Sequence, residues 1–150
     1  MMMKIVSPKK KYKDDDIYQD ITSYVTNPQK CYQRLITERN LSYGHYAEDM
    51  YQLANKYGKL KGTRIRHVVV TFEKNETDVH TVFDIAQWAC DYYKNEYQVF
   101  AAVHENTDHL HFHMIMNTVG IKDGKKYRGR KKDFYPCIVD LEGRKPSTPL

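Results

Sequence analysis

The stretch His104-Glu-Asn-Thr-Asp-His109-Leu-His111-Phe-His113-Met-Ile-Met-Asn117 decides the fold of this chain. It holds four of the seven histidines, and three of these alternate with Leu110 and Phe112. A period of two is typical of a β-strand, whose alternate side chains point to one face. Because the residues after His113 are apolar on both faces, we expect a central strand, buried on both sides except where the histidines open onto a site.

A neighbouring strand supplies a further histidine. Residues 97–104 have the composition of a strand and 105–108 form a tight connection, so an antiparallel hairpin is the simplest arrangement. The hairpin places His104 beside His111 and His113. Neutral imidazoles spaced about 6–7 Å along a strand face, with one more from a neighbour, can converge on a divalent metal. With no carboxylate among them, the metal keeps open positions and its full charge, which suits a phosphodiester.

The rest of the chain alternates between strand and helix patterns. Apolar residues at helical spacing predict helices over residues 17–25, 46–57 and 79–95. Asp16 is positioned to cap the first of these helices, and Gly58 to stop the second. Short apolar runs predict strands over residues 4–7, 64–72 and 110–119.

Two segments give no such pattern. Residues 9–16 read as an exposed charged turn, and residues 29–44 as mixed or irregular. The order of the elements nevertheless predicts an α+β fold, with helices packed against a central, mainly antiparallel sheet. We expect one domain over residues 1–143, with 144–150 as a tail or a truncated boundary.

The charge of the chain is modestly positive but clustered. Lys and Arg number 24 against 19 Asp and Glu, for a formal net charge of +5. One basic cluster spans residues 9–13 and another spans 122–132, and such clusters attract phosphates. A solvated basic loop explains either cluster equally well. The candidate DNA contacts in the second cluster are Lys125, Lys126, Arg128 and Arg130.

Cysteine usage and the amino-terminal sequence indicate the compartment. Cys31, Cys90 and Cys137 are widely separated and form no CxxC pair, which fits a reducing cytoplasm. The amino terminus has no long apolar segment of the kind found in secretory signals. No run approaches the ~20 apolar residues of a membrane span. We therefore expect a cytoplasmic protein with no membrane contact.

Three segments together resemble a known family. The pattern His104-x-Asn106-x-x-x-x-His111-x-His113-x-x-x-Asn117 resembles the third motif of conjugative relaxases, the mobilisation nucleases of the HUH superfamily. The segment from Ile21 to Lys30 resembles their first motif, and His67-Val-Val-Val-Thr71-Phe72 their second. The match is nearest to the P class, which contains the VirD2-like nucleases. The resemblance covers about residues 3–128, and three motifs in the family's order make it specific.

The resemblance implies a fold, a reaction and partners. The fold is that of HUH endonucleases, with a ferredoxin- or palm-like sheet. The reaction is attack by a tyrosine on single-stranded DNA at a transfer origin, which leaves the enzyme on the 5′ phosphate and allows religation. Because a phenol with the ordinary pKa near 10 is protonated at neutral pH, attack needs activation, and a divalent metal, Mn²⁺ or Mg²⁺, is the implied cofactor. Relaxosome accessory and coupling proteins are implied partners of a monomeric nuclease.

Individual residues follow from the same resemblance. Tyr24 matches the nucleophile, against Tyr12, Tyr18 and Tyr32 as competitors and against a simple packing role on its helix. Thr71 and His67 match the segment that holds DNA. The supporting residues that the resemblance suggests around the ligand histidines are Asn106, Asp108, His109 and Asn117.

One position departs from the family pattern. The family usually has Asp two residues after the first histidine, where this chain has Asn106. An Asp there can accept a hydrogen bond from a ligand imidazole or help to deprotonate the nucleophile. Asn can orient a partner but cannot take the proton, and Glu105 and Asp108 are the nearby carboxylates that can substitute for it.

Three other functions remain open. A rolling-circle replication initiator shares the histidines and the tyrosine, but its tyrosine usually follows the histidines, whereas Tyr24 precedes them. A DNA-binding module with weakened catalysis is suggested by Asn106 alone. An unrelated hydrolase using a metal-bound water would form no covalent protein–DNA species.

Overall fold

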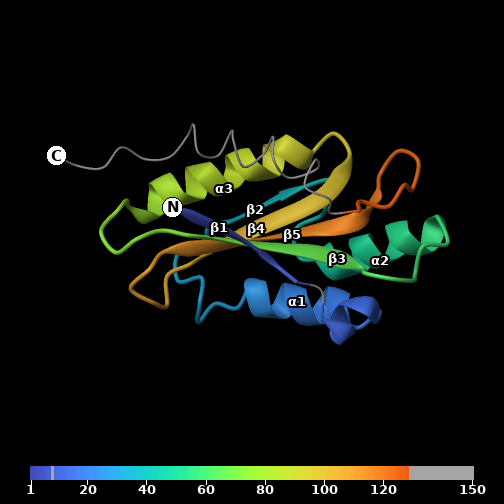
Figure 1. Ribbon diagram of the computed structural model, residues 1–150, viewed down its shortest axis with the longest axis horizontal. Helices are drawn as coiled ribbons and strands as arrows, with labels where there is room; N and C mark the ends of the chain where they lie inside the picture. Colours follow the sequence, from blue (N-terminus) through green and yellow to red (C-terminus); the bar gives the residue numbers. More distant parts are fainter. Residues whose placement is uncertain (8, 129–150) are drawn as a thin grey trace.

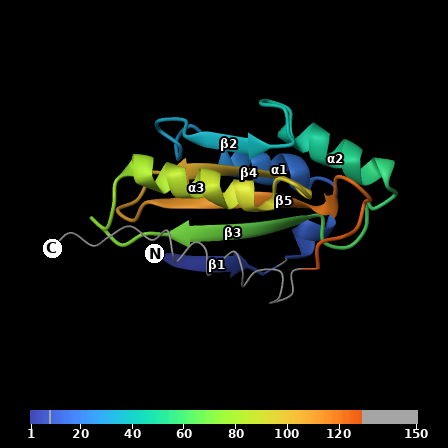
Figure 2. The same cartoon turned by 90° about the horizontal axis from the view of Figure 1, so that it is seen from above.

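A single antiparallel sheet organises the protein, which we describe from a computed structural model that covers residues 1–7 and 9–128 (Figure 1). The strands of the described residues are β1 (Met2–Val6), β2 (Ile36–Arg39), β3 (Ile65–Thr71), β4 (Tyr97–His104) and β5 (His111–Gly120). Their order is β1-β3-β5-β4-β2, and each neighbouring pair is antiparallel (Figure 2). The predictions of an α+β fold, a central histidine-bearing strand and a β4–β5 hairpin are confirmed.

Helices cover both faces of the sheet. They are α1 (Ile17–Val25), α2 (Tyr46–Lys56) and α3 (Val79–Tyr93), preceded by the short 3-10 helix η1 (Lys10–Lys13). In Figure 1, α3 lies on one side of the sheet and α1 and α2 lie on the other. Each helix presents an apolar stripe to the sheet, as its sequence period predicts.

The two cores meet at β5, which is buried on both faces. Phe112, Met114 and Met116 pack in the core under α3. Ile115 and Val119 point the other way, into the core under α1 and α2. Because each large apolar side chain contributes about 1.5–3 kcal/mol when fully buried, β5 is fixed in register from both sides, and with it the positions of its histidines.

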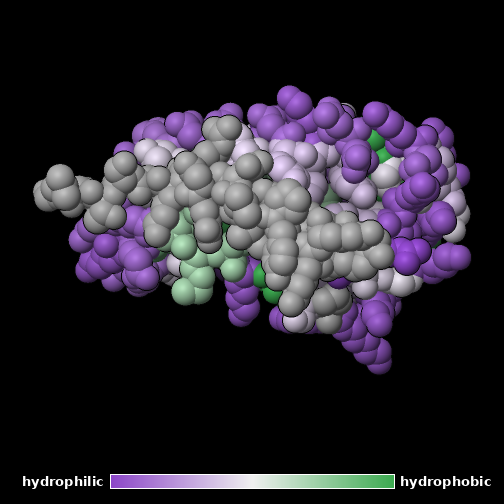
Figure 3. Space-filling model, turned by 45° about the horizontal axis from the view of Figure 1, so that its top comes forward, coloured by the Kyte–Doolittle hydropathy of each residue, from purple (hydrophilic) through white to green (hydrophobic). Residues whose placement is uncertain are grey.

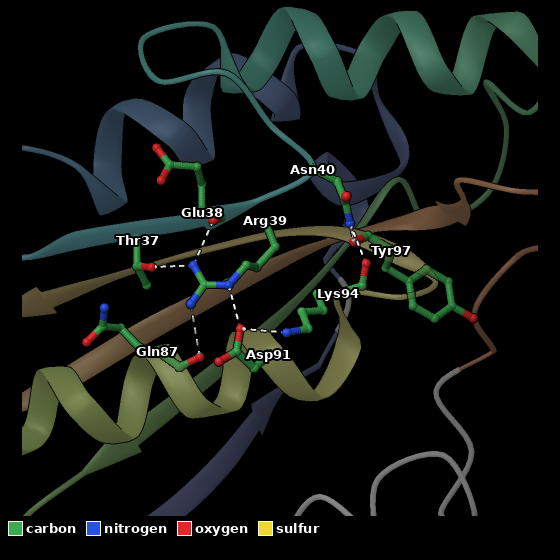
Figure 4. Close-up of polar contacts among 8 residues, drawn as sticks. All are labelled: Thr37, Glu38, Arg39, Asn40, Gln87, Asp91, Lys94 and Tyr97. Carbon is green, nitrogen blue, oxygen red and sulfur yellow. Dashed lines mark hydrogen bonds and ion pairs between the residues drawn. The ribbon is translucent and has the colours of Figure 1, made fainter.

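The edge strand β2 was not predicted from the sequence. Its register pairs Ile36 with Ala102 and Arg39 with Val99. Figure 4 shows how its end is tied to α3: Arg39 Nε lies 2.7 Å from the Asp91 carboxylate. Beyond the strand, Asn40 donates to the carbonyls of Lys94 and Tyr97 at 2.6 and 2.8 Å. Contacts distant in sequence thus stabilise a four-residue strand that has no alternating pattern of its own.

The segment before α1 also differs from expectation. Instead of an exposed turn, it contains η1, whose Tyr12 is only 3% exposed. Asp16 does precede α1, but its side chain makes no capping hydrogen bond. Gly58, with φ +64°, follows α2 as predicted, and its N–H bonds the Asn55 carbonyl.

The face seen in Figure 3 is mostly hydrophilic where its residues are coloured. Among residues 1–7 and 9–128, no helix is long and apolar enough to cross a membrane. Cys31 and Cys90 are buried free thiols. Cys137 and the predicted domain boundary at residues 143–144 lie outside the described residues.

Candidate metal and DNA-cleavage site

Three histidines converge where β4 ends and β5 begins. His104 pairs directly with His111 across the hairpin, and His113 lies two residues further along β5. All three point to the face that α1 covers. One ring nitrogen from each lies within 4.8 Å of the others, and the group contains no carboxylate. His104 and His113 are buried and His111 is half-buried.

The second ring nitrogen of each histidine is held by a hydrogen bond. His104 Nε2 lies 2.8 Å from the carbonyl of Val25, at the end of α1. His111 Nδ1 lies 2.9 Å from the His109 carbonyl, and His113 Nδ1 lies 2.7 Å from His67 Nε2. These bonds leave His104 Nδ1, His111 Nε2 and His113 Nε2 as the potential ligand atoms.

The histidine group fits a divalent metal. Metal–nitrogen bonds of about 2.0–2.1 Å place ligand nitrogens roughly 3–3.4 Å apart, so the rings need to close by only a small movement from their present spacing. Neutral imidazole is a ligand for divalent transition metals, and a metal held by these three rings would keep positions for water or substrate oxygens.

Burial favours the neutral form of two of these imidazoles, His104 and His113. The pKa of His113 is lowered to about 2, first by burial and then by His104, His67 and His111 around it. The pKa of His104 is also lowered, mainly by burial, although its hydrogen bond to Val25 opposes the shift. Both rings therefore carry a free lone pair at neutral pH, as a metal ligand requires.

Tyr24 lies against the histidines. Its ring centroid is 5.6 Å from that of His113 and 6.1 Å from that of His104. The side chain is 45% exposed, which leaves it accessible to a substrate. Lys30 Nζ lies 4.1 Å from the centroid of the same ring. A tyrosine ring, an ammonium and three imidazoles thus lie close together.

The competing tyrosines are placed differently. Tyr18 is 2% exposed, and burial raises its pKa to about 12. Tyr12 is also buried, its pKa is raised by burial and then by Tyr24, and its hydroxyl bonds His67. Tyr32 is 59% exposed. Of the four tyrosines, Tyr24 alone combines ring contacts to His104 and His113 with an exposed side chain.

Four residues were expected to support the ligands. Asn106 is exposed in the β4–β5 turn. Asp108 pairs with Lys74 at 4.0 Å. His109 lies before the strand rather than on its face, with Nδ1 3.2 Å from the Phe72 carbonyl. Asn117 is buried at the other end of β5. Of these four residues, only His109 forms a hydrogen bond with a ligand histidine: its carbonyl accepts from His111 Nδ1 at 2.9 Å.

Neither nearby carboxylate turns toward the histidines. Asp108 is exposed and faces Lys74. Glu105 accepts hydrogen bonds from the backbone N–H and the side-chain amide of Gln33, at 3.1 and 2.8 Å. The proton-accepting role open to Asp at position 106 is therefore not taken by Glu105 or Asp108 in this conformation.

The expected DNA contacts do not lie together. Thr71 is paired with His111 and borders the site, whereas His67 is buried beneath it. Lys125, Lys126 and Arg128 follow β5, at the opposite end of the strand from its histidines. Arg130 lies outside the described residues. The other basic cluster is nearer: the pKa of His67 is lowered first by burial and then by the charges of Lys9, His104 and Lys11.

Lys126 has a local role. Its ammonium donates to the carbonyls of Lys61 and Thr63 at 3.0 and 2.8 Å. Burial, followed by the charges of Arg64 and Arg66, lowers its pKa to about 8. Lys125 and Arg128 are exposed.

Sequence reasoning gave no role to Lys30 and considered Tyr12 only as a competing nucleophile. Lys30 stands six positions after Tyr24, and its place over the tyrosine ring depends on the turn at residues 27–31. Its carbonyl accepts from the Glu105 N–H at 2.8 Å, which fastens that turn to the end of β4. Tyr12 reaches His67 across 55 positions. A basic residue close after a candidate nucleophile was a visible signal, whereas Tyr12 gave none.

The sequence of this chain is similar to those of known proteins. A sequence model of the family described as "Relaxase: MobA/VirD2-like, nuclease domain" matches residues 24–137, more than half of the chain. Proteins called "Protein rlx" from Staphylococcus aureus are similar: one is 27% identical over 91 residues and another is 30% identical over 92. These alignments cover 60% and 59% of this chain but only 28% and 29% of the relatives.

Proposed function

Because this chain belongs to the MobA/VirD2-like relaxase nuclease family, we propose that it cleaves and rejoins single-stranded DNA at a transfer origin, with Tyr24 as nucleophile. The observation that carries this proposal is the contact of one exposed tyrosine with two of three convergent histidines. Order along the chain also favours a relaxase over a rolling-circle initiator, because Tyr24 precedes the histidines.

The proposed reaction is a transesterification. The Tyr24 hydroxyl oxygen attacks phosphorus, the bond from phosphorus to the 3′ oxygen breaks, and a bond from phosphorus to tyrosine forms. The phenol gives up its proton and the departing 3′ oxygen gains one, so the products are a 5′-phosphotyrosyl enzyme and a free 3′ hydroxyl. Because one phosphodiester replaces another, religation is the same step reversed and needs no nucleotide cofactor.

The histidines have a defined task in this scheme. His104, His111 and His113 would hold a divalent cation, Mn²⁺ or Mg²⁺, which when bound neutralises charge on the non-bridging phosphate oxygens. The neutral state of His104 and His113 supports that task, because burial lowers the pKa of both rings.

Lys30 would add a fixed positive charge to the same place. Its ammonium lies over the Tyr24 ring, where it favours negative charge both on the attacking oxygen and on the phosphate. Thr71, at the border of the site, and Lys9 and Lys11, near His67, would contact the strand. Lys125 and Arg128 would meet DNA further away, along the opposite end of β5.

The larger context is also a proposal. The chain spans a little more than a quarter of the relatives it matches, and we propose that it forms the nuclease part of a relaxase that mobilises a plasmid or conjugative transposon. It would act in the cytoplasm on origin DNA, together with relaxosome accessory and coupling proteins.

The test is a covalent capture experiment. The protein is incubated with labelled single-stranded DNA carrying the transfer origin, with Mn²⁺ or Mg²⁺, and resolved on a denaturing gel. We expect a band of protein-linked DNA that disappears in Tyr24→Phe and persists in the matched variant Tyr32→Phe. A band that survives Tyr24→Phe would show that another residue is the nucleophile.

A second candidate function rests on one observation. Because Glu105 and Asp108 both face away from the histidines, a DNA-binding module with weakened catalysis is the alternative. In that case the protein would shift origin DNA on a native gel and yield no covalent band, even with the metal present.

A further inference from the structure

A buried chain of three rings lies behind the histidine site. Tyr12 Oη lies 2.9 Å from His67 Nδ1, and His67 Nε2 lies 2.7 Å from His113 Nδ1. The rings of Tyr12 and His67 are stacked, and those of His67 and His113 have centroids 4.9 Å apart. Tyr12 and His67 are 3% and 5% exposed, so water has little access to this chain.

The partner of His113 differs in kind from the partners of the other two ligands. His104 and His111 each bond a backbone carbonyl. A carbonyl only accepts, so the bonded nitrogen must carry the proton and the other nitrogen keeps the lone pair. His67 Nε2 can either donate or accept, and the tautomer of His113 is therefore not set by a carbonyl.

One proton is shared between His67 Nε2 and His113 Nδ1, and only one of its two positions leaves a ligand. If His113 Nδ1 carries it, His113 Nε2 has a free lone pair toward the site. If His67 Nε2 carries it, neutral His113 must hold its own proton on Nε2, which then cannot bind a metal. The ligand state therefore needs His67 protonated on Nδ1, where Tyr12 Oη can accept that hydrogen.

We propose that His67, held by Tyr12, is a positioning residue that selects the metal-binding tautomer of His113. The inference rests on the proposed metal site and gives His67 a role distinct from the DNA contact expected from its motif. Burial disfavours a doubly protonated ring at either position. Both rings therefore stay neutral, and His67 affects only which nitrogen of His113 carries the proton.

Mn²⁺ titration by calorimetry tests this role. Partners that orient a ligand histidine are typically worth about 10–100-fold in metal affinity, and we expect a loss in that range for His67→Leu. His67→Gln keeps an acceptor at the position of Nε2 and should recover most of the affinity. Gln98→Leu, an equally buried polar-to-apolar change at the far end of β4, is the matched control and should bind Mn²⁺ like the wild type.

The titration distinguishes a failure of the metal site from a failure of the role proposed for His67. Wild type that binds no Mn²⁺ would refute the metal site itself. Thermal unfolding shows whether both proteins are folded. If folded wild type and folded His67→Leu bind Mn²⁺ equally, the role of His67 is overturned and the metal site still stands.

A spectroscopic readout checks the tautomer without using activity. Long-range ¹H–¹⁵N correlation spectra of the imidazole rings, recorded with diamagnetic Mg²⁺, identify which nitrogen of each histidine carries the proton. We expect His67 and His113 both to carry it on Nδ1. His67 protonated on Nε2 in the metal-loaded protein would contradict the proposal.

Tyr12→Phe probes the outer end of the chain of rings. It removes the acceptor for His67 Nδ1–H, so we expect a smaller loss of Mn²⁺ affinity than in His67→Leu. Tyr46→Phe is its control, because Tyr46 is also buried and its hydroxyl bonds Glu38, away from the histidines. An equal loss in both phenylalanine variants would show that the Tyr12 hydroxyl has no specific effect.

Discussion

The two ends of β5 carry polar side chains on the same face, yet they are built differently. At one end, Asn117 is fully buried, and its amide donates to the Met50 carbonyl and to Gln98 while its oxygen accepts from the Val119 N–H. At the other end, His111 and His113 each have one ring nitrogen in a hydrogen bond, and among the described residues the other nitrogen has none. We call the Asn117 end of β5 the closed end, because its polar groups are all paired with protein groups, and the His111–His113 end the open end, because its free ring nitrogens can take a ligand.

Removing a ligand should have the largest effect on the open end. For His113→Ala we expect Mn²⁺ affinity to fall by at least about 100-fold, beyond the usual effect of a residue that only orients a ligand. Because His113 is buried and hydrogen-bonded to His67, stability should fall as well, so affinity is compared between proteins shown to be folded. Calorimetric titration measures it, and unchanged binding in both His113→Ala and His111→Ala would refute the histidine site.

A substitution at the closed end should lower stability and leave metal affinity unchanged. Asn117→Leu leaves the partners of the amide without hydrogen bonds, at about 1–3 kcal/mol for each buried group. A fall of roughly 3 °C in Tm per kcal/mol is expected for a chain of this size. Mn²⁺ affinity should stay at the wild-type value once the protein is folded. Weaker metal binding at unchanged Tm would mean that Asn117 belongs to the site after all.

A carboxylate at position 106 should strengthen the open end modestly. Asn106 is exposed two residues after His104, and a unit charge at a separation on the order of 8 Å from a cation would be worth about 0.5 kcal/mol in water. Asn106→Asp should therefore raise Mn²⁺ affinity roughly two- to threefold at low salt. Asn95→Asp, with the same charge change in the turn before β4, should leave it unaltered. Equal effects in both would assign the gain to net charge.

The smallest expected effect is a pH dependence of stability that comes from Lys126, which follows the closed end of β5 in the chain. The pKa of Lys126 falls from 10.5 to about 8 on folding, so between these values the unfolded chain binds a proton that the folded chain has released. Relative to Lys126→Met, wild-type stability is then highest above pH 10.5 and is lost as pH falls toward 8. Thermal unfolding of both proteins at about pH 7.5 and 10.5 should show a difference of roughly 1–3 °C; a difference that is constant with pH would contradict the lowered pKa.

Periodicity made the centre of the fold predictable. His111, Phe112 and His113 alternate because β5 has two buried faces, and that pattern is local to the sequence. The edge strand β2 was missed because Arg39 and Glu38 are held by Asp91 and Tyr46, which its own residues do not reveal. Local pattern therefore predicts the strands that the core encloses better than those that surface contacts hold.

The same limit applies to the site. Convergence of His104 on His111 and His113 followed from a hairpin that the sequence predicts, and the structure has that register. Tyr12 looked exposed because lysines surround it, yet its ring is buried against His67. His109 seemed to continue the alternation, but strand pairing begins only at His111. Hydrogen bonds between distant segments decide these placements, and no spacing in the sequence reports them.

The central claim is that Tyr24 forms the bond to DNA, and its most direct test is to locate that bond. After reaction with origin DNA and trimming by nuclease, trypsin releases residues 14–30 as one peptide that contains both Tyr18 and Tyr24. Tandem mass spectrometry of this peptide should find the residual nucleotide on Tyr24. A nucleotide on Tyr18 or on any peptide outside residues 14–30, or no adduct with DNA that is nevertheless cut, would contradict the account.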